Sequence, residues 1–168
     1  MHIRSFLPAA LFFFSVIGAI GNELDFKRQV FHAKLKEAGQ TIELKIVEVP
    51  FKKQGRRIET VDNYVRKIDG REVIGSDGLI PYAELSSFTL KWNGKDIPVP
   101  EKLWKDCYNL GVGAYNEPEH PEPGHDPKVK VTEDGEYLII RFSGSDGAGY
   151  YDVIWILAKN GQHARWMQ

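Results

Sequence analysis

The chain has 168 residues, of which 42% are hydrophobic and 27% are charged, a composition typical of one globular domain and not of a disordered segment. Its 22 lysines and arginines nearly balance its 23 aspartates and glutamates, giving a net charge of −1. That balance supplies no broad basic surface of the kind that binds nucleic acid or an anionic membrane. We therefore expect no nucleic-acid partner.

Residues 1–21 differ in character from the rest of the chain. Arg4 is followed by an uncharged apolar run from Leu7 to Ile20, which is shorter than the ~20 residues that span a bilayer. This pattern predicts a secretory signal peptide, residues 1–21, cleaved before Asn22. We expect residues 22–168 to form a single exported domain, periplasmic or extracellular, with no stable membrane insertion after cleavage. A retained anchor or a buried helix is the alternative.

Alternating apolar and polar residues dominate the first half of the mature chain. The segments 31–36 and 42–46 alternate strictly on either side of a short turn, which predicts a β-hairpin. Asp69-Gly70 and Asn93-Gly94 then favour type I′ turns, because both central positions of such a turn need a positive φ. The alternation from Phe88 to Trp92 leads directly into the second of these turns.

One segment, about residues 100–110, has the pattern of a short helix. Pro100 suits a first helical turn, Leu103 and Cys107 share an i,i+4 stripe, and Gly111 suits a C-terminal stop. Four more strands are predicted between residues 129 and 167, joined by short turns. We expect a mainly β fold of about 8–10 antiparallel strands with this one helix, arranged as a sandwich or a barrel-like meander.

Cys107 is the only cysteine, so the chain cannot form an intramolecular disulfide. Its place on the apolar stripe with Leu103 predicts a buried, unreactive side chain. A catalytic thiol or a disulfide between two chains is the alternative.

The loop at residues 115–128 combines histidines, carboxylates and four prolines. Nitrogen and oxygen donors of this kind bind zinc or similar ions, and the candidate ligands are His120, His125, Glu117 and Asp126. The spacing matches no defined zinc motif, however, and a solvated polar loop explains the same composition. We expect no cofactor, with a divalent metal in this loop as the alternative.

The glycine-rich loop at residues 143–149 is the second candidate site. A strand follows it instead of a helix, and it contains no lysine, so it is not a phosphate-binding loop. Its exposed polar groups could bind a ligand through Ser145, Asp146 and Tyr150. Among the other aromatic residues, Trp92, Trp155 and Trp166 fall on apolar strand faces and are expected in the core, whereas Tyr137 is expected to be exposed.

These observations favour an exported, non-catalytic binding or interaction module. Its contact surface would be the loops 111–128 and 143–150, and its partner an unidentified protein or small molecule. The first alternative is an exported hydrolase, possibly metal-assisted through the loop 115–128. Its candidate acids and bases are Asp146, Asp152, Glu117, Glu119, His120 and His125. The second alternative is a structural or oligomeric protein of the cell envelope.

Overall fold

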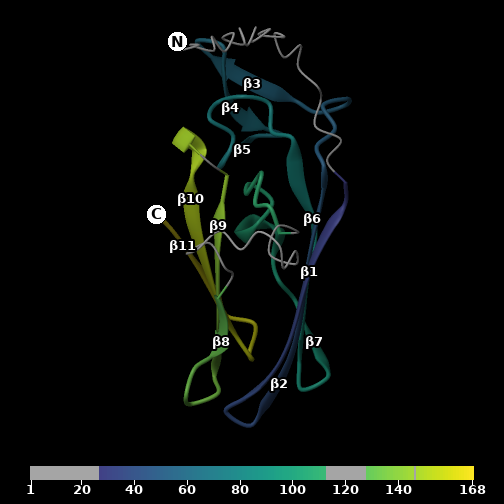
Figure 1. The fold of residues 1–168 in the computed structure, drawn as a ribbon, viewed down its shortest axis with the longest axis vertical. Coiled ribbons are helices and arrows are strands. Elements are labelled where there is room, and N and C mark those ends of the chain that lie inside the picture. Colours follow the sequence, from purple (N-terminus) through teal and green to yellow (C-terminus); the bar gives the residue numbers. More distant parts are fainter. Residues whose placement is uncertain (1–26, 113–127, 146) are drawn as a thin grey trace, which may run out of the picture.

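The structure is a computed structural model and describes residues 27–112, 128–145 and 147–168. Within these ranges the chain forms three antiparallel sheets, two large and one small, and no α-helix (Figure 1). The mainly β, antiparallel class expected from the sequence is confirmed. The expected signal peptide, residues 1–21, lies outside the described residues.

The strands fall into three groups, each contiguous in space. The N-terminal sheet has the order β1-β2-β6-β7, made of β1 (Gln29–Glu37), β2 (Gln40–Pro50), β6 (Ala83–Trp92) and β7 (Lys95–Ile97). The C-terminal sheet has the order β11-β10-β9-β8, made of β8 (Lys128–Val131), β9 (Tyr137–Gly144), β10 (Tyr151–Ala158) and β11 (His163–Met167). The small sheet has the order β3-β4-β5, made of β3 (Ile58–Val61), β4 (Tyr64–Ile68) and β5 (Arg71–Glu72).

Positive-φ residue pairs form the hairpin turns. Asn93 and Gly94 have φ of 50° and 77° between β6 and β7, and Asp69 and Gly70 have φ of 52° and 77° between β4 and β5. Turns of this hand match the right-handed twist of the flanking strands. Both hairpins that the sequence predicts from these dipeptides are therefore confirmed.

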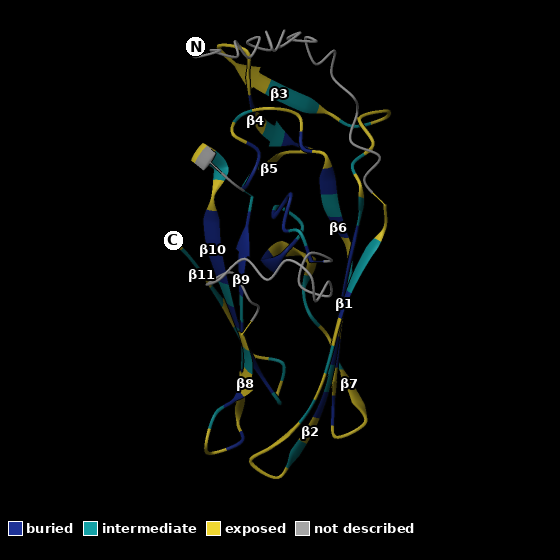
Figure 2. Cartoon of the chain, in the orientation of Figure 1, coloured by how far each residue is buried: buried dark blue, intermediate teal, exposed yellow. Residues whose placement is uncertain are grey.

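The two large sheets face each other across one hydrophobic core. Phe31 on β1 meets Phe142 on β9 with ring centroids 5.0 Å apart, and Phe88 on β6 meets Trp155 on β10 at 5.1 Å. Both pairs are edge-to-face, a geometry that adds about 0.5–1.5 kcal/mol per pair to the effect of burial. Figure 2 colours long stretches of β9 and β10 as buried, and the core cluster contains residues from both large sheets. Because each sheet keeps its own strand order, the described part of the chain is a sandwich and not a closed barrel.

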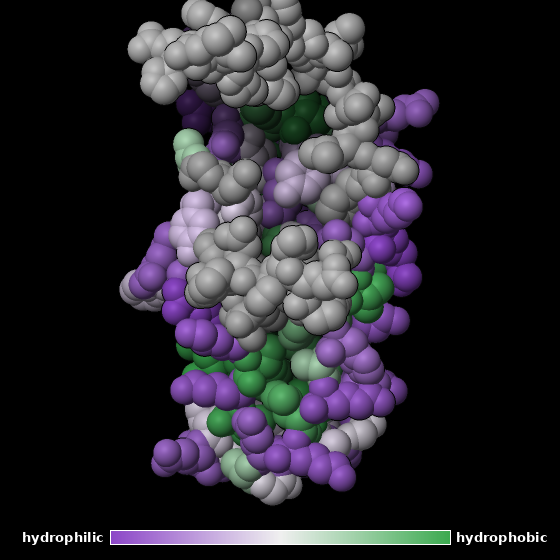
Figure 3. Space-filling model, in the orientation of Figure 1, coloured by the Kyte–Doolittle hydropathy of each residue, from purple (hydrophilic) through white to green (hydrophobic). Residues whose placement is uncertain are grey.

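Edge strands β1 and β8 approach each other along one side of the sandwich. The backbone N–H of Val131 donates to Glu37 Oε2 at 3.0 Å, which joins the two sheets. Ala33, Leu35 and Val129 pack half-buried against the core from these same strands. Figure 3 views the molecule from the direction of Figure 1 and shows hydrophobic atoms between hydrophilic margins in the lower half.

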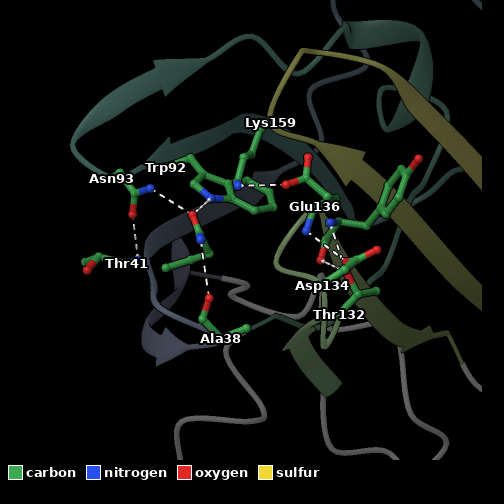
Figure 4. Close-up of polar contacts among 10 residues, drawn as sticks. Ala38, Thr41, Trp92, Asn93, Thr132, Asp134, Glu136 and Lys159 are labelled. Carbon is green, nitrogen blue, oxygen red and sulfur yellow. Dashed lines mark hydrogen bonds and ion pairs between the residues drawn. The ribbon is translucent and has the colours of Figure 1, made fainter.

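Side-chain hydrogen bonds and an ion pair connect turn residues at one end of the sandwich (Figure 4). Gln40 Oε1 accepts hydrogen bonds from Trp92 Nε1 at 3.0 Å and from Asn93 Nδ2 at 2.8 Å, tying two hairpins of the N-terminal sheet together. In the C-terminal sheet, Lys159 and Glu136 form an ion pair at 3.0 Å. Both large sheets thus have their turns fixed by side-chain contacts at this end.

The predicted helix over about 100–110 is wrong in extent. A single 3-10 turn, Glu101–Leu103, stands in its place, followed by turn residues 104–106 and then by the buried segment 107–110. Its backbone forms bridges to other segments, pairing Cys107 with Ile74 and Tyr108 with Glu84. One i to i−4 bond forms, from the Lys105 N–H to the Glu101 carbonyl at 2.9 Å, but from Tyr108 onward the backbone bonds to other segments. The i,i+4 stripe that suggested a longer helix is therefore coincidental.

The small sheet extends the molecule beyond one end of the sandwich (Figure 1). Val65 and Ile68 pack with Tyr108 in a second hydrophobic cluster. Arg56 reinforces the junction, because its guanidinium donates to Asp69 Oδ2 at 2.6 Å and to Glu84 Oε2 on β6 at 2.9 Å. The junction therefore combines apolar packing with a half-buried ion-pair network.

Candidate functional site

The sequence-predicted site residues are only partly within the described ranges. Ser145 and Tyr150 lie in the connection between β9 and β10, whereas Asp146 lies outside the described residues. The four candidate metal ligands, His120, His125, Glu117 and Asp126, also lie outside them. Among the residues that are described, no group of three or more His, Cys, Asp or Glu is placed to hold a metal ion.

Tyr150 belongs to a hydrogen-bonded cluster around the carboxylate of Asp152. Its hydroxyl donates to Asp152 Oδ1 at 3.0 Å, Ser143 Oγ donates to the same oxygen at 2.5 Å, and Arg141 pairs with Oδ2. Burial on its own would raise the pKa of Asp152, but the donated hydrogen bonds from Ser143, Arg141 and Tyr150 lower it below its usual value. An ionised carboxylate with these three donors orients Tyr150 at the surface and is a poor general base.

Ser145 faces a different neighbour, the turn at residues 75–78. Its backbone N–H donates to the carbonyl of Asn109 at 2.8 Å, and its φ is 59°. A Cβ added to Gly149 would lie 2.8 Å from Ser145 Oγ and would collide with the carboxylate of Asp77. The two described members of the predicted ligand set therefore have separate surroundings: Tyr150 joins Ser143 and Asp152, and Ser145 packs beside Asp77.

Glu48 is a buried residue that the sequence reasoning missed. It follows Ile42, Leu44 and Ile46 on the inner face of β2 and is completely buried. Its Oε1 accepts the backbone N–H of Leu110 at 2.7 Å, and its Oε2 accepts that of Val112 at 3.0 Å. Burial raises its pKa, although these backbone bonds act in the opposite direction. Glu48 thus holds the segment at 110–112 in the core.

The outer face of the C-terminal sheet carries an apolar surface. We call it the apolar outer face, and its members are Tyr137, Ile139, Ile154, Ile156, Ala164 and Trp166. The register makes them neighbours, since Ile154 pairs with Trp166, and Ile156 pairs with both Ala164 and Ile139. Their side chains point away from the core because the intervening residues on β9 and β10, such as Leu138 and Trp155, are fully buried.

Trp166 corrects one expectation from the sequence. It was assigned to the core, yet 61% of its surface is exposed, whereas Trp92 and Trp155 are buried as expected. Apolar residues occupy both faces of β10, so hydrophobicity alone did not show which face of β11 points inward. Tyr137 and Tyr150 are exposed at 42% and 47%, which confirms the expectation for Tyr137.

The outer face of the opposite sheet has a different composition. Its exposed residues include five basic side chains and few acidic ones: His32, Lys34, Lys36, Lys45 and Lys91, with Thr41, Thr89 and Asp96. An antiparallel sheet usually has one face in the core and one polar face in water, and the N-terminal sheet follows this rule. The C-terminal sheet is apolar on both faces, and only its inner face is covered within the described residues.

A shallow hollow of about 660 Å³ opens at the end of the apolar outer face nearest the turn between β10 and β11. Tyr137, Ile156 and Ala164 line it on the sheet side, and residues 160–163 line it on the turn side. Asn160 and Gln162 place amide groups at its rim, and these groups can donate and accept hydrogen bonds. The hollow therefore combines an apolar floor with polar groups that could orient a ligand.

Cys107 is fully buried, as the sequence predicts, and has the properties of a structural residue. Burial raises the pKa of its thiol to about 12, so the reactive thiolate is suppressed at neutral pH.

No helix in the described part of the chain is long and apolar enough to cross a membrane.

Comparison with known proteins yields no relative, since no family model, curated protein or solved structure matches the chain significantly. Any function must therefore be inferred from the geometry of the chain itself. Its two most informative features are the apolar outer face and the Asp152 cluster at one end of it.

Proposed function

We propose that this chain is an exported binding module that holds a partner on the apolar outer face. The observation that carries the proposal is the difference between the two outer faces, one lysine-rich and one apolar with Trp166 at its margin. Fully covering an isoleucine-sized side chain contributes roughly 1.5–3 kcal/mol. A partner that covers several of these residues would gain enough free energy for specific binding.

The surface proposed here differs from the loops that the sequence favoured. Tyr150 and the Asp152 cluster border the apolar outer face, because Ser143 and Arg141 lie on the same side of β9 as Ile139. The connection between β9 and β10 therefore serves as a polar rim to this face. The loop 111–128 is described only at its ends, and the proposal does not depend on it.

The alternative of an exported hydrolase has less support from the described residues. Four of its candidate groups, Glu117, Glu119, His120 and His125, lie outside the described ranges, as does Asp146. The remaining one, Asp152, is engaged by three donors. Burial raises its pKa, but the hydrogen bonds from Ser143, Arg141 and Tyr150 outweigh burial. The resulting pKa lies below the usual value of an aspartate and away from the value that a general acid needs at neutral pH.

A photo-crosslinking experiment in the native cells tests the proposal. A photo-reactive phenylalanine replaces Ala164 on the apolar outer face in one variant and Thr89 on the opposite outer face in the other. We expect position 164 to form a discrete adduct with another protein and position 89 to form none. The proposal is wrong if neither position gives an adduct, or if both give the same one. An adduct between two copies of the chain also contradicts it and favours the oligomeric alternative.

A further inference from the structure

Positively charged residues lie along one edge of the apolar outer face, on strand β8. Cross-strand pairing places Trp166, Ile154, Arg141 and Lys128 in one row across the sheet. A second row contains Ala164, Ile156, Ile139 and Lys130. Each row thus begins with apolar side chains on β11 and β10 and ends with a lysine on β8.

The two lysines are exposed, and neither has an ion-pair partner among the described residues. Arg141, by contrast, is paired with Asp152, and Lys159 is paired with Glu136. Within the described part of the chain, Lys128 and Lys130 are therefore the charges of this surface that no ion pair neutralises. They lie at i and i+2 on one strand, so both side chains project from the same face.

From this pattern we infer that the partner presents an amphipathic helix with an apolar ridge and a row of carboxylates along one side of it. The inference rests on the proposed function and specifies its partner. Neighbouring strands are about 4.8 Å apart, so a row of four residues spans roughly 14 Å. A helix with its side chains is about 10–12 Å across, which matches that width.

In this arrangement the helix lies along the strands. Its apolar ridge covers β10 and β11, and its carboxylates lie above Lys128 and Lys130 on β8. A helix packed on the apolar face of a sheet is a common layered architecture, and the described part of the chain supplies no helix of its own for this face. Opposite charges across the rim select the partner and its direction more than they add affinity.

Two synthetic helical peptides of about 18 residues, or five turns, provide the test. Both carry the same leucine ridge; one has glutamates and the other lysines along one side of it. At low salt we expect the purified protein to bind the glutamate peptide about tenfold more tightly, as expected for two exposed charge pairs that change from attraction to repulsion. The preference should weaken as salt is added.

The decisive variant is Lys128→Glu/Lys130→Glu, which should reverse the preference so that the lysine peptide binds more tightly. The matched control, Lys36→Glu/Lys45→Glu, alters two exposed lysines of the opposite outer face and should leave the preference unchanged. Trp166→Ala should weaken the binding of both peptides by a similar factor, because the substitution removes apolar contact area and no charge.

The inference is overturned if the two peptides bind equally, if neither binds, or if the control variant also reverses the preference. The same holds if only vesicles of phosphatidylglycerol bind in place of the peptides. These outcomes are distinct from failure of the proposed function. Crosslinking from position 164 to a protein would still support a binding face, although one with a different partner.

Discussion

Replacing Glu48 with glutamine should destabilise the protein substantially, although the two side chains have nearly the same shape. The carboxylate accepts two backbone hydrogen bonds, from the N–H of Leu110 at 2.7 Å and from the N–H of Val112 at 3.0 Å. A glutamine has one carbonyl oxygen, so its NH2 group would face one of these N–H donors. A buried donor without an acceptor costs about 1–3 kcal/mol, and the other bond loses its charge assistance.

We therefore expect Glu48→Gln to lower the free energy of unfolding by about 1–3 kcal/mol, the cost of the unpaired donor. Relief from burying a charge offsets the lost charge assistance, because burial outweighs the backbone bonds in setting the pKa of Glu48. Urea denaturation measures this value, and hydrogen exchange locates it, because the amides of Leu110 and Val112 should exchange faster. Glu43→Gln is the matched control, since Glu43 lies on the same strand with its side chain at the surface. It should leave these amides protected.

The pH dependence gives a second measure of the same residue. Burial raises the pKa of Glu48, so the native state binds this proton more tightly than the unfolded state. Its contribution to stability is fully present below the unfolded pKa of 4.5 and is lost as pH rises through the folded pKa. The stability difference between wild type and Glu48→Gln should therefore grow as pH falls. The reasoning is refuted if wild type and Glu48→Gln are equally stable at neutral pH and the amides of Leu110 and Val112 exchange at the same rate in both.

Four further predictions concern other residues. Acrylamide should strongly quench the fluorescence of one of the four tryptophans, and Trp166→Phe should remove this quenchable part of the emission. Strongly quenched emission that survives the substitution contradicts the exposure of Trp166. A thiol reagent should label Cys107 only after unfolding, because the pKa of its buried thiol is raised to about 12, and rapid labelling of the native protein would argue against this. Gly149→Ala should cost about 1–3 kcal/mol of stability through collision with Asp77, and Asp77→Gly in the same chain should restore part of it. Asp152→Asn should flatten the acid limb of the stability curve, because the lowered pKa of Asp152 gives a contribution present above 3.8 and lost as pH falls through the folded value.

The sequence was sufficient to predict the features that depend on local geometry. Asn93-Gly94 and Asp69-Gly70 predict their hairpins because a positive φ is a property of the residues in the turn. The same holds for the buried position of Cys107, which any apolar neighbourhood would favour. The antiparallel class followed from these turns and from the short links between strands.

Features set by distant residues could not be predicted in this way. The helix expected after Leu103 does not form because Cys107 and Tyr108 pair with Ile74 and Glu84, which the i,i+4 pattern does not reveal. Glu48 is buried because amides far along the chain meet it. Trp166 points outward because the register with β10 places it opposite Ile154, and either face of β11 was plausible from hydrophobicity alone.

The chain order of the two sheets has a consequence for folding. The C-terminal sheet is an uninterrupted meander from β8 to β11, whereas β2 and β6 of the N-terminal sheet pair across the insertion of the small sheet. During synthesis, the first sheet would emerge with its inner face bare until the last strands leave the ribosome. Phe31 and Phe88 have no aromatic partners before Phe142 and Trp155 arrive. We expect one late, cooperative transition, with a rate limited by contacts between residues far apart in the chain.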